Sequence, residues 1–239
     1  MSALDAGAPG PYGSTVAGLV DLDSRIPGGI ASGTGIVLSP DGVVVTNYHE
    51  VARASTIQAT DLGDGRVYSA RVLGRDPGHD IAVVRLTGAS GLPTAPFGDS
   101  DRIRVGDRVA AIGNAGGRGG RPTITTGEIT ALDRSIVAND DTTHQHRRLR
   151  GMIQVSADVQ PGDSGGALVG DGGVIGMNTA TSPGAGYAIP INTVLAIAHK
   201  LASDGGSGPD PGELSSRRSL AAKSGRVGVA RVTGRPHGD

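Results

Sequence analysis

Short runs of β-branched and other aliphatic residues, separated by turn residues, occupy the chain from about residue 15 to residue 190. In the segment GIVLSPDGVVVTN, Pro40, Asp41 and Gly42 form the turn that joins two such runs. The pattern repeats in DRVAAIG, TITTGEITAL, GMIQVSA and GALVGDGGVIGMNT. Runs of this length at this spacing, without alternating helical segments, predict an all-β sandwich or barrel.

The core of such a fold must be built from aliphatic side chains. Hydrophobic residues make up 37% of the chain, but aromatic residues only 2%. Glycine accounts for 41 of the 239 residues, well above the usual share of about 7%. The composition therefore predicts many tight turns, and the length allows one large domain or two small fused ones.

Two helical segments interrupt the strands. One is a short turn in TNYHEVARA, and the other is a helix over residues 192–201, where Asn192 would be the N-cap and apolar residues recur on one face. The chain then loses the apolar density that a folded domain needs, so we expect a disordered tail over residues 202–239. Residues 1–13 are expected to be a flexible N-terminus.

Charge and cysteine content exclude several classes of partner and chemistry. The formal net charge is −1, which gives no field that would attract nucleic acid, so none is expected as a partner. The absence of cysteine excludes disulfides and thiolate metal sites. We expect no membrane span and see no signal peptide, because the chain has neither a run of about 18 apolar residues nor a basic start followed by an apolar segment.

The segment PGDSGG places Ser164 in a G-x-S-x-G pattern, which occurs at the nucleophile elbow of α/β-hydrolases. That fold needs a helix after the serine, whereas the following residues predict strand, turn and strand. It also needs a histidine after the serine, and only His199, in the predicted helix, and His237, in the predicted tail, follow. The α/β-hydrolase interpretation is therefore disfavoured.

The alternative order of histidine, acid and serine fits the chain better. His49 lies at the end of an apolar strand, Asp80 at the start of a buried strand, and Ser164 between glycines. A serine hydroxyl needs a neutral imidazole to accept its proton, and the imidazole needs a carboxylate to fix its tautomer. The glycines around Ser164 would let the N–H groups of Gly162 and Ser164 point at one oxyanion.

With these residues in place, the sequence resembles the trypsin-like serine proteases, and most closely their HtrA-like branch, which includes secreted PepA-type proteases of actinobacteria. The resemblance covers nearly all of residues 15–201. It is carried by several separate segments in the right order: ASGTGIVLSPDGVVVTNYH, GRDPGHDIAVVRL, VGDRVAAIGNAGG, IQVSADVQPGDSGGALV and GMNTATSPGAGYAIPI.

The resemblance implies a protease domain over residues 14–201 made of two six-stranded antiparallel β-barrels, at about 14–100 and 101–190, with the short C-terminal helix. It implies that His49 is the general base, Asp80 the orienting acid and Ser164 the nucleophile of a serine endopeptidase. Protein or peptide substrates, no metal or other cofactor, and a location outside the cell or in its envelope are implied as well. The oligomeric state is left open.

The chain departs from the family pattern in its length. HtrA-like proteins usually continue into PDZ domains of roughly 80 to 100 residues, and fewer than 40 residues follow Leu201. We therefore expect no PDZ domain and no activation through one.

The resemblance also places Asp158, six residues before the nucleophile, at the base of the pocket for the substrate side chain before the cut. A carboxylate there would favour arginine or lysine, because a buried charge needs a partner. The alternative is that Asp158 caps backbone N–H groups and the family's preference for small aliphatic residues remains. The expected pocket walls are Thr179, Gly184, Ala185 and Gly186.

Four further features of the sequence allow predictions about single residues or short segments. Asp163 is expected to support the oxyanion loop through local hydrogen bonds, Glu50 to lie at the rim of the cleft, and His79 to face away from Asp80. The basic segment HQHRRLR, residues 144–150, is expected to be a mobile loop. The rival interpretation of the whole chain is a catalytically silent relative that binds peptides in the same cleft.

Overall fold

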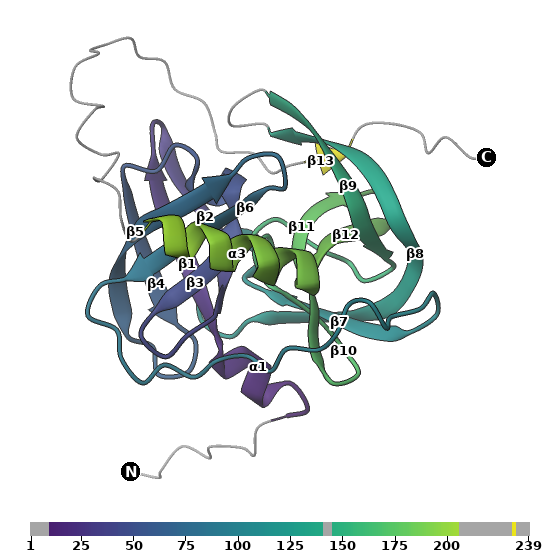
Figure 1. Ribbon diagram of the computed structural model, residues 1–239, viewed down its shortest axis with the longest axis horizontal. Helices are drawn as coiled ribbons and strands as arrows, with labels where there is room; N and C mark the ends of the chain where they lie inside the picture. The colour runs from purple at the N-terminus through teal and green to yellow at the C-terminus, as the bar shows by residue number, and fades with distance from the viewer. Residues whose placement is uncertain (1–9, 141–144, 206–230, 233–239) are drawn as a thin grey trace.

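A computed structural model describes residues 10–140, 145–205 and 231–232 of the chain (Figure 1). Most of the predicted N-terminal segment and tail lie outside these residues, so the predicted domain boundaries stay predictions. In the described part, two β-barrels lie side by side, as the resemblance implies.

The first barrel is closed by six antiparallel strands in the order β1-β2-β3-β6-β5-β4. Its aliphatic interior includes Val20, Val37 and Val44, all completely buried. The predicted hairpin is present as the antiparallel pair of β2 and β3. Gly42 in its turn has a φ of 89°, which glycine adopts easily. The strands are β1 (Leu19–Ile26), β2 (Gly29–Val37), β3 (Val43–Asn47), β4 (Thr56–Asp61), β5 (Val67–Asp76) and β6 (Ile81–Leu86).

The second barrel is formed by β7 to β12, whose antiparallel pairs β7–β8, β8–β9, β9–β12, β12–β11, β11–β10 and β10–β7 complete a ring. Arg231–Val232, within the predicted tail, forms the short strand β13 between β8 and β11. The other strands are β7 (Arg108–Gly113), β8 (Thr123–Asp140), β9 (Gln145–Val155), β10 (Ala167–Gly170), β11 (Gly173–Ser182) and β12 (Ala185–Pro190).

The interpretation of residues 144–150 as a mobile loop is wrong from Gln145 onward, because β9 begins there and pairs with the far end of β8. The two strands form a long hairpin that extends past the rest of the sheet (Figure 1). Leu149 is buried in it, whereas Arg148 and Arg150 on either side are exposed. This alternation is that of a half-buried strand, but the many charges concealed it in the sequence.

Four short or terminal elements complete the fold: α1 (Gly13–Ala17), α2 (Tyr48–Val51), the 3-10 turn η1 (Ala115–Gly117) and α3 (Ile191–Gly205). The predicted C-terminal helix is confirmed as α3, which continues four residues past its predicted end. It packs against β3, β5 and β6 of the first barrel and against β11 and β12 of the second (Figure 1).

One buried cluster crosses the boundary between the barrels. Leu19 and Ile81 from the first barrel, Ile112 and Met177 from the second, and Val194 from α3 belong to it. The barrels are therefore held together by shared apolar burial, which stabilises one arrangement of the two.

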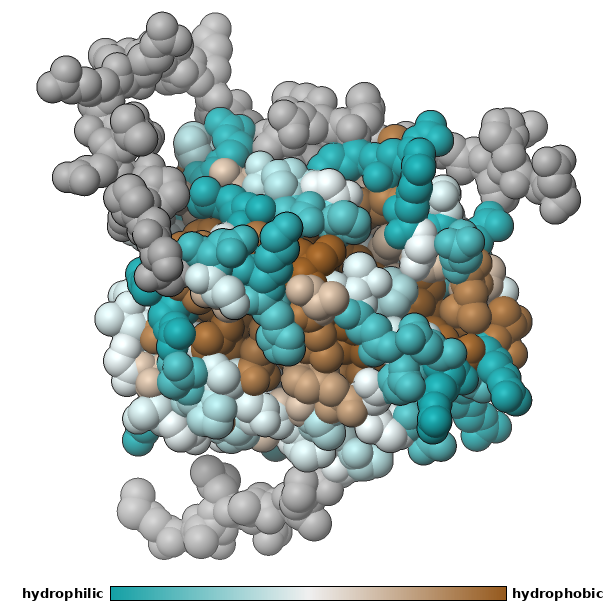
Figure 2. All heavy atoms as spheres, viewed as in Figure 1, coloured by the Kyte–Doolittle hydropathy of each residue, from teal (hydrophilic) through white to brown (hydrophobic). Residues whose placement is uncertain are grey.

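The surface combines both kinds of side chain. On the face seen in Figure 2, polar residues lie at the top, across the centre and at the lower right, and apolar residues show between them and at the right edge. Such a mixture is usual, because apolar atoms contribute more than half of the accessible surface of folded proteins. Among the described residues, no helix has the length and apolar character that crossing a bilayer requires.

Candidate active site

The histidine predicted as general base lies where the first barrel leads into α2. Strand β3 ends at Asn47, and His49 follows in the first turn of the helix. The chain is tied here to Asp80, since Asn47 Nδ2 and Tyr48 N both donate to the Asp80 carbonyl oxygen, at 3.0 and 3.1 Å. The His49 side chain is 9% exposed, so the ring is nearly enclosed.

Asp80 is the most heavily bonded carboxylate among the described residues, and it is almost completely buried. Its Oδ2 lies 2.7 Å from His49 Nδ1 and accepts from Thr179 Oγ1 at 2.7 Å. Its Oδ1 accepts from His49 N at 3.1 Å and from Arg147 Nη1 at 2.8 Å. Its φ of 58° is unusual for a residue other than glycine, although aspartate tolerates this region better than most.

These contacts shift the pKa values of Asp80 and His49 in opposite directions. Burial alone would raise the pKa of Asp80, but the charges of His49 and Arg147 and the hydrogen bonds from His49 and Thr179 outweigh it and lower the pKa. Burial alone would lower the pKa of His49, but Asp80 and then Glu50 outweigh it and raise the pKa to about 10. The arrangement is that of an ionised aspartate holding a protonated imidazole.

The serine does not yet face the imidazole in this structure. His49 Nε2, the nitrogen that would take the serine proton, lies 3.1 Å from Glu50 Oε1. The Ser164 hydroxyl instead donates to the Thr179 carbonyl oxygen at 3.4 Å. Glu50 is 8% exposed and not at an open rim as predicted; it fits because Gly33 has no side chain, and a Cβ there would lie 2.6 Å from the Glu50 carboxyl carbon.

The loop that carries Ser164 is fixed by strand β2 of the opposite barrel. Thr34 N donates to the Ser164 carbonyl at 2.8 Å, and Thr34 Oγ1 donates to the Gly162 carbonyl at 2.9 Å. Gly162 has a φ of 96°, and a Cβ there would lie 2.0 Å from the Asn114 carbonyl oxygen. Only glycine can hold this turn.

The turn leaves two N–H groups for a ligand. None of the hydrogen bonds between described residues uses the N–H of Gly162 or of Ser164 as donor. Both residues are buried, so these donors would strongly favour a negative oxygen placed between them. This is the chemistry that an oxyanion hole requires.

Asp163 supports the same loop from inside. It is 1% exposed, and its Oδ2 accepts from Gln160 N at 2.8 Å, which is the local bonding that the sequence predicts. Burial and then the charge of Asp158 raise the pKa of Asp163 to about 6, against the opposing hydrogen bond from Gln160.

The residues predicted to form the specificity pocket are not all placed as expected. Asp158 is exposed, and its Oδ1 accepts from Gln160 Nε2 at 2.6 Å. It is therefore not the enclosed carboxylate that the sequence predicts, because it lies in the segment between β9 and β10 and is exposed there. Thr179, expected as a pocket wall, is 1% exposed and turns its hydroxyl to Asp80.

The remaining predicted wall residues lie in and after the turn between β11 and β12. Gly184 is exposed, Ala185 half-buried and Gly186 buried. A Cβ at Gly186 would lie 2.5 Å from Val159 Cγ2, so this glycine permits close packing against the segment before the serine loop. Their assignment to a pocket wall stays a prediction.

Two contributors to the site were not predicted in their observed roles. Arg147 and Thr179 both bind Asp80, across sequence separations of 67 and 99 residues. No motif predicts such contacts, although the threonine lies within an apolar strand, β11, and could have been expected to be buried. The neighbour His79 faces away as predicted: it is exposed and lies 2.8 Å from Asp76 Oδ2.

Comparisons with known proteins find a family and several relatives for this chain. The family described as trypsin-like peptidase domain matches residues 33–177. A probable periplasmic serine endoprotease, DegP-like, of Chlamydia muridarum is 41% identical over 183 residues, and periplasmic serine endoprotease DegP of Escherichia coli is 38% identical over 184. These matches cover 72% and 74% of this chain, but only 34% and 37% of the relatives.

Solved structures give the same picture. The HtrA-type protease AlgW with a tripeptide superposes with a TM-score of 0.70 and 33% identity, over 81% of this chain and 63% of that one. A structure of a variant of the same protease with a decapeptide superposes with a TM-score of 0.70 and 29% identity. The chain thus spans about a third of the length of these two curated relatives.

Proposed function

This chain belongs to the trypsin-like peptidase family, with HtrA-type relatives, and we propose from that premise that it is a serine endopeptidase with Ser164 as nucleophile. One observation carries the proposal. Thr179 holds groups from both barrels, because its hydroxyl donates to Asp80 while its carbonyl accepts from Ser164 Oγ. This supports the proposal, because Thr179 links the serine hydroxyl to the His49–Asp80 pair.

In the proposed reaction, His49 Nε2 takes the proton of the Ser164 hydroxyl as Oγ attacks the carbonyl carbon of the peptide bond. The oxygen becomes negative and is bound by the N–H groups of Gly162 and Ser164, at roughly 3 kcal/mol for each donor. His49 then gives its proton to the leaving amine, and water repeats the sequence on the acyl-enzyme. Each step needs Glu50 to leave Nε2 first.

A serine-directed fluorophosphonate tests the proposal. We expect one covalent adduct at Ser164, detected by intact-mass and peptide mass spectrometry, and cleavage of an unfolded protein by the same preparation. The Ser164→Ala variant should show neither. Labelling should be followed from pH 6 to about pH 11, because His49, whose pKa is raised to about 10, must lose its proton to act as a base. Absence of an adduct across this range, in protein shown to be folded, would contradict the proposal.

The second candidate is a peptide-binding relative without catalysis. It is favoured by one specific feature, the Glu50 carboxylate on His49 Nε2, which leaves Ser164 bonded to a backbone carbonyl. Binding of an extended peptide without phosphonate labelling would favour it.

We further propose that protein or peptide chains are the substrates, and that the protein acts outside the cytoplasm. The named relatives are periplasmic endoproteases, and the similar solved structures contain peptides. The oligomeric state is not part of the proposal.

We also propose that the enzyme prefers arginine or lysine before the cut, and we expect this preference to be small. Asp158 is exposed, and an exposed ion pair contributes up to about 1 kcal/mol, which corresponds to roughly a fivefold preference for the basic peptide. We expect Asp158→Ala to lower kcat/KM for a peptide with arginine before the cut by about threefold, and to leave a valine peptide unchanged.

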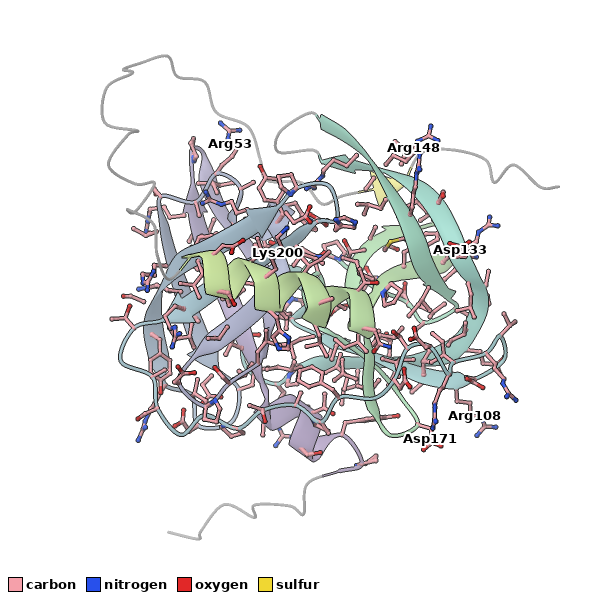
Figure 3. The ribbon with its side chains drawn as sticks, viewed as in Figure 1. Arg53, Arg108, Asp133, Arg148, Asp171 and Lys200 are labelled. Carbon is pink, nitrogen blue, oxygen red and sulfur yellow. The ribbon has the colours of Figure 1, made fainter. Side chains whose placement is uncertain are left out.

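The matched control for this specificity test is Asp171→Ala, an exposed aspartate at the lower edge of the molecule (Figure 3). It should change neither peptide. A parent enzyme that prefers valine over arginine would overturn the basic preference.

A further inference from the structure

Arg147 reaches from β9 of the second barrel to the acid of the first. Its Nη1 lies 2.8 Å from Asp80 Oδ1, and its side chain is 11% exposed. The guanidinium carbon lies 5.3 Å from the centre of the Tyr48 ring, within the range of a cation–π contact. An enclosed arginine held by both an ion pair and an aromatic face has few alternative rotamers.

Building on the proposed function, we propose that Arg147 is a positioning residue, which fixes the Asp80 carboxylate toward His49 and makes the triad depend on the β8–β9 hairpin. The geometry supports this division of roles. Asp80 gives Oδ2 to the imidazole and Oδ1 to the guanidinium, so the arginine binds the carboxylate without competing for the oxygen that His49 uses.

The charges around the pair determine what Arg147 does to the base. His49 faces Asp80 at Nδ1 and Glu50, on α2, at Nε2; Asp80 also faces Arg147 and the hydroxyl of Thr179, on β11. The Ser164 hydroxyl lies on the serine loop nearby. Arg147 is the cation in this group that does not take part in the reaction. Its charge offsets that of Asp80, and this offset favours the neutral imidazole that a general base must be.

The β8–β9 hairpin connects the position of Arg147 to that of the second barrel. Arg147 is paired with Ala138 on β8, near the end of both strands. A shift of this end relative to the first barrel would move the guanidinium and the carboxylate that it binds. The opposite barrel therefore contributes to the histidine side of the site, and not only to the serine.

The test compares Arg147→Met with the parent in the pH profile of kcat/KM for one peptide. Removing the cation leaves the charge of Asp80 less offset, so the pKa of His49 rises. We expect the acidic limb to move to higher pH by about half to one unit, and the rate below that limb to fall about three- to tenfold. KM should change less than kcat, and Arg147→Lys should restore part of the original profile.

The matched control is Arg148→Met, because the next residue of β9 is exposed and points outward (Figure 3). It should leave the profile unchanged. An Arg147→Met variant that keeps the parent's limb, or loses rate equally at every pH with no rescue by lysine, would overturn the proposal. Failure of the parent to react with a fluorophosphonate would instead contradict the proposed function.

Discussion

Asp80→Asn is expected to lower kcat by about 10⁴-fold while leaving the two barrels folded. The carboxylate now accepts from His49 Nδ1 at 2.7 Å and so keeps the proton on that nitrogen. An asparagine amide that turns its NH2 toward the ring would stabilise the other tautomer, in which Nε2 carries the proton and cannot accept one from Ser164. Hydrolysis of an unfolded protein and the rate of fluorophosphonate labelling both measure the loss.

The same substitution has a second consequence, because Asp80 is also the partner of Arg147. A guanidinium that is 11% exposed would lose the charge of Asp80 beside it, and removal of one member of a buried pair costs about 3 to 5 kcal/mol. Thermal unfolding should therefore be followed in parallel, so that lost chemistry is separated from lost structure.

The matched control for Asp80→Asn is Asp76→Asn. Asp76 and His79 form an exposed pair with nearly the same distance, 2.8 Å, only a few residues away. This variant should keep the parent's activity. If Asp76→Asn removed activity and Asp80→Asn did not, the assignment of the orienting acid would be wrong.

The fold could be predicted, and His49, Asp80 and Ser164 could be proposed as the site, because both depend on local signals. Turn residues such as Gly42 and the glycines around Ser164 mark backbone conformations that other residues adopt poorly. Short aliphatic runs between such turns leave few alternatives to barrels or sandwiches. The order of histidine, acid and serine then fits the trypsin-like arrangement far better than that of the α/β-hydrolases.

The electrostatic setting of the site could not be predicted, because it depends on contacts between residues far apart in the chain. The charges of residues 144–150 conceal a strand whose one inward arginine, Arg147, meets Asp80 across 67 positions. Asp158 differs, because its observed partner Gln160 is only two residues away, and no turn or strand pattern predicts a bond between two exposed side chains. Glu50 adjoins His49 in sequence, yet its burial depends on the space left by Gly33.

Glu50→Gln is expected to move the acidic limb of kcat/KM to lower pH by one to two units. Burial opposes protonation of His49, but the charges of Asp80 and Glu50 raise its pKa to about 10. The base is therefore depleted below that pH, and activity rises as pH increases through the pKa. Removing one of the two carboxylate charges lowers the pKa, so the rate near pH 6 should increase about ten- to a hundredfold.

Glutamine keeps the size of the side chain that fills the space beside Gly33, so the change tests charge and not packing. Glu128→Gln, at an exposed position of β8, is the matched control and should leave the profile unchanged. The shift is opposite in sign to that expected for Arg147→Met, and the two together test whether one titrating group, His49, underlies the limb. A Glu50→Gln profile that coincides with the parent's would mean that Glu50 has already left Nε2 when substrate binds.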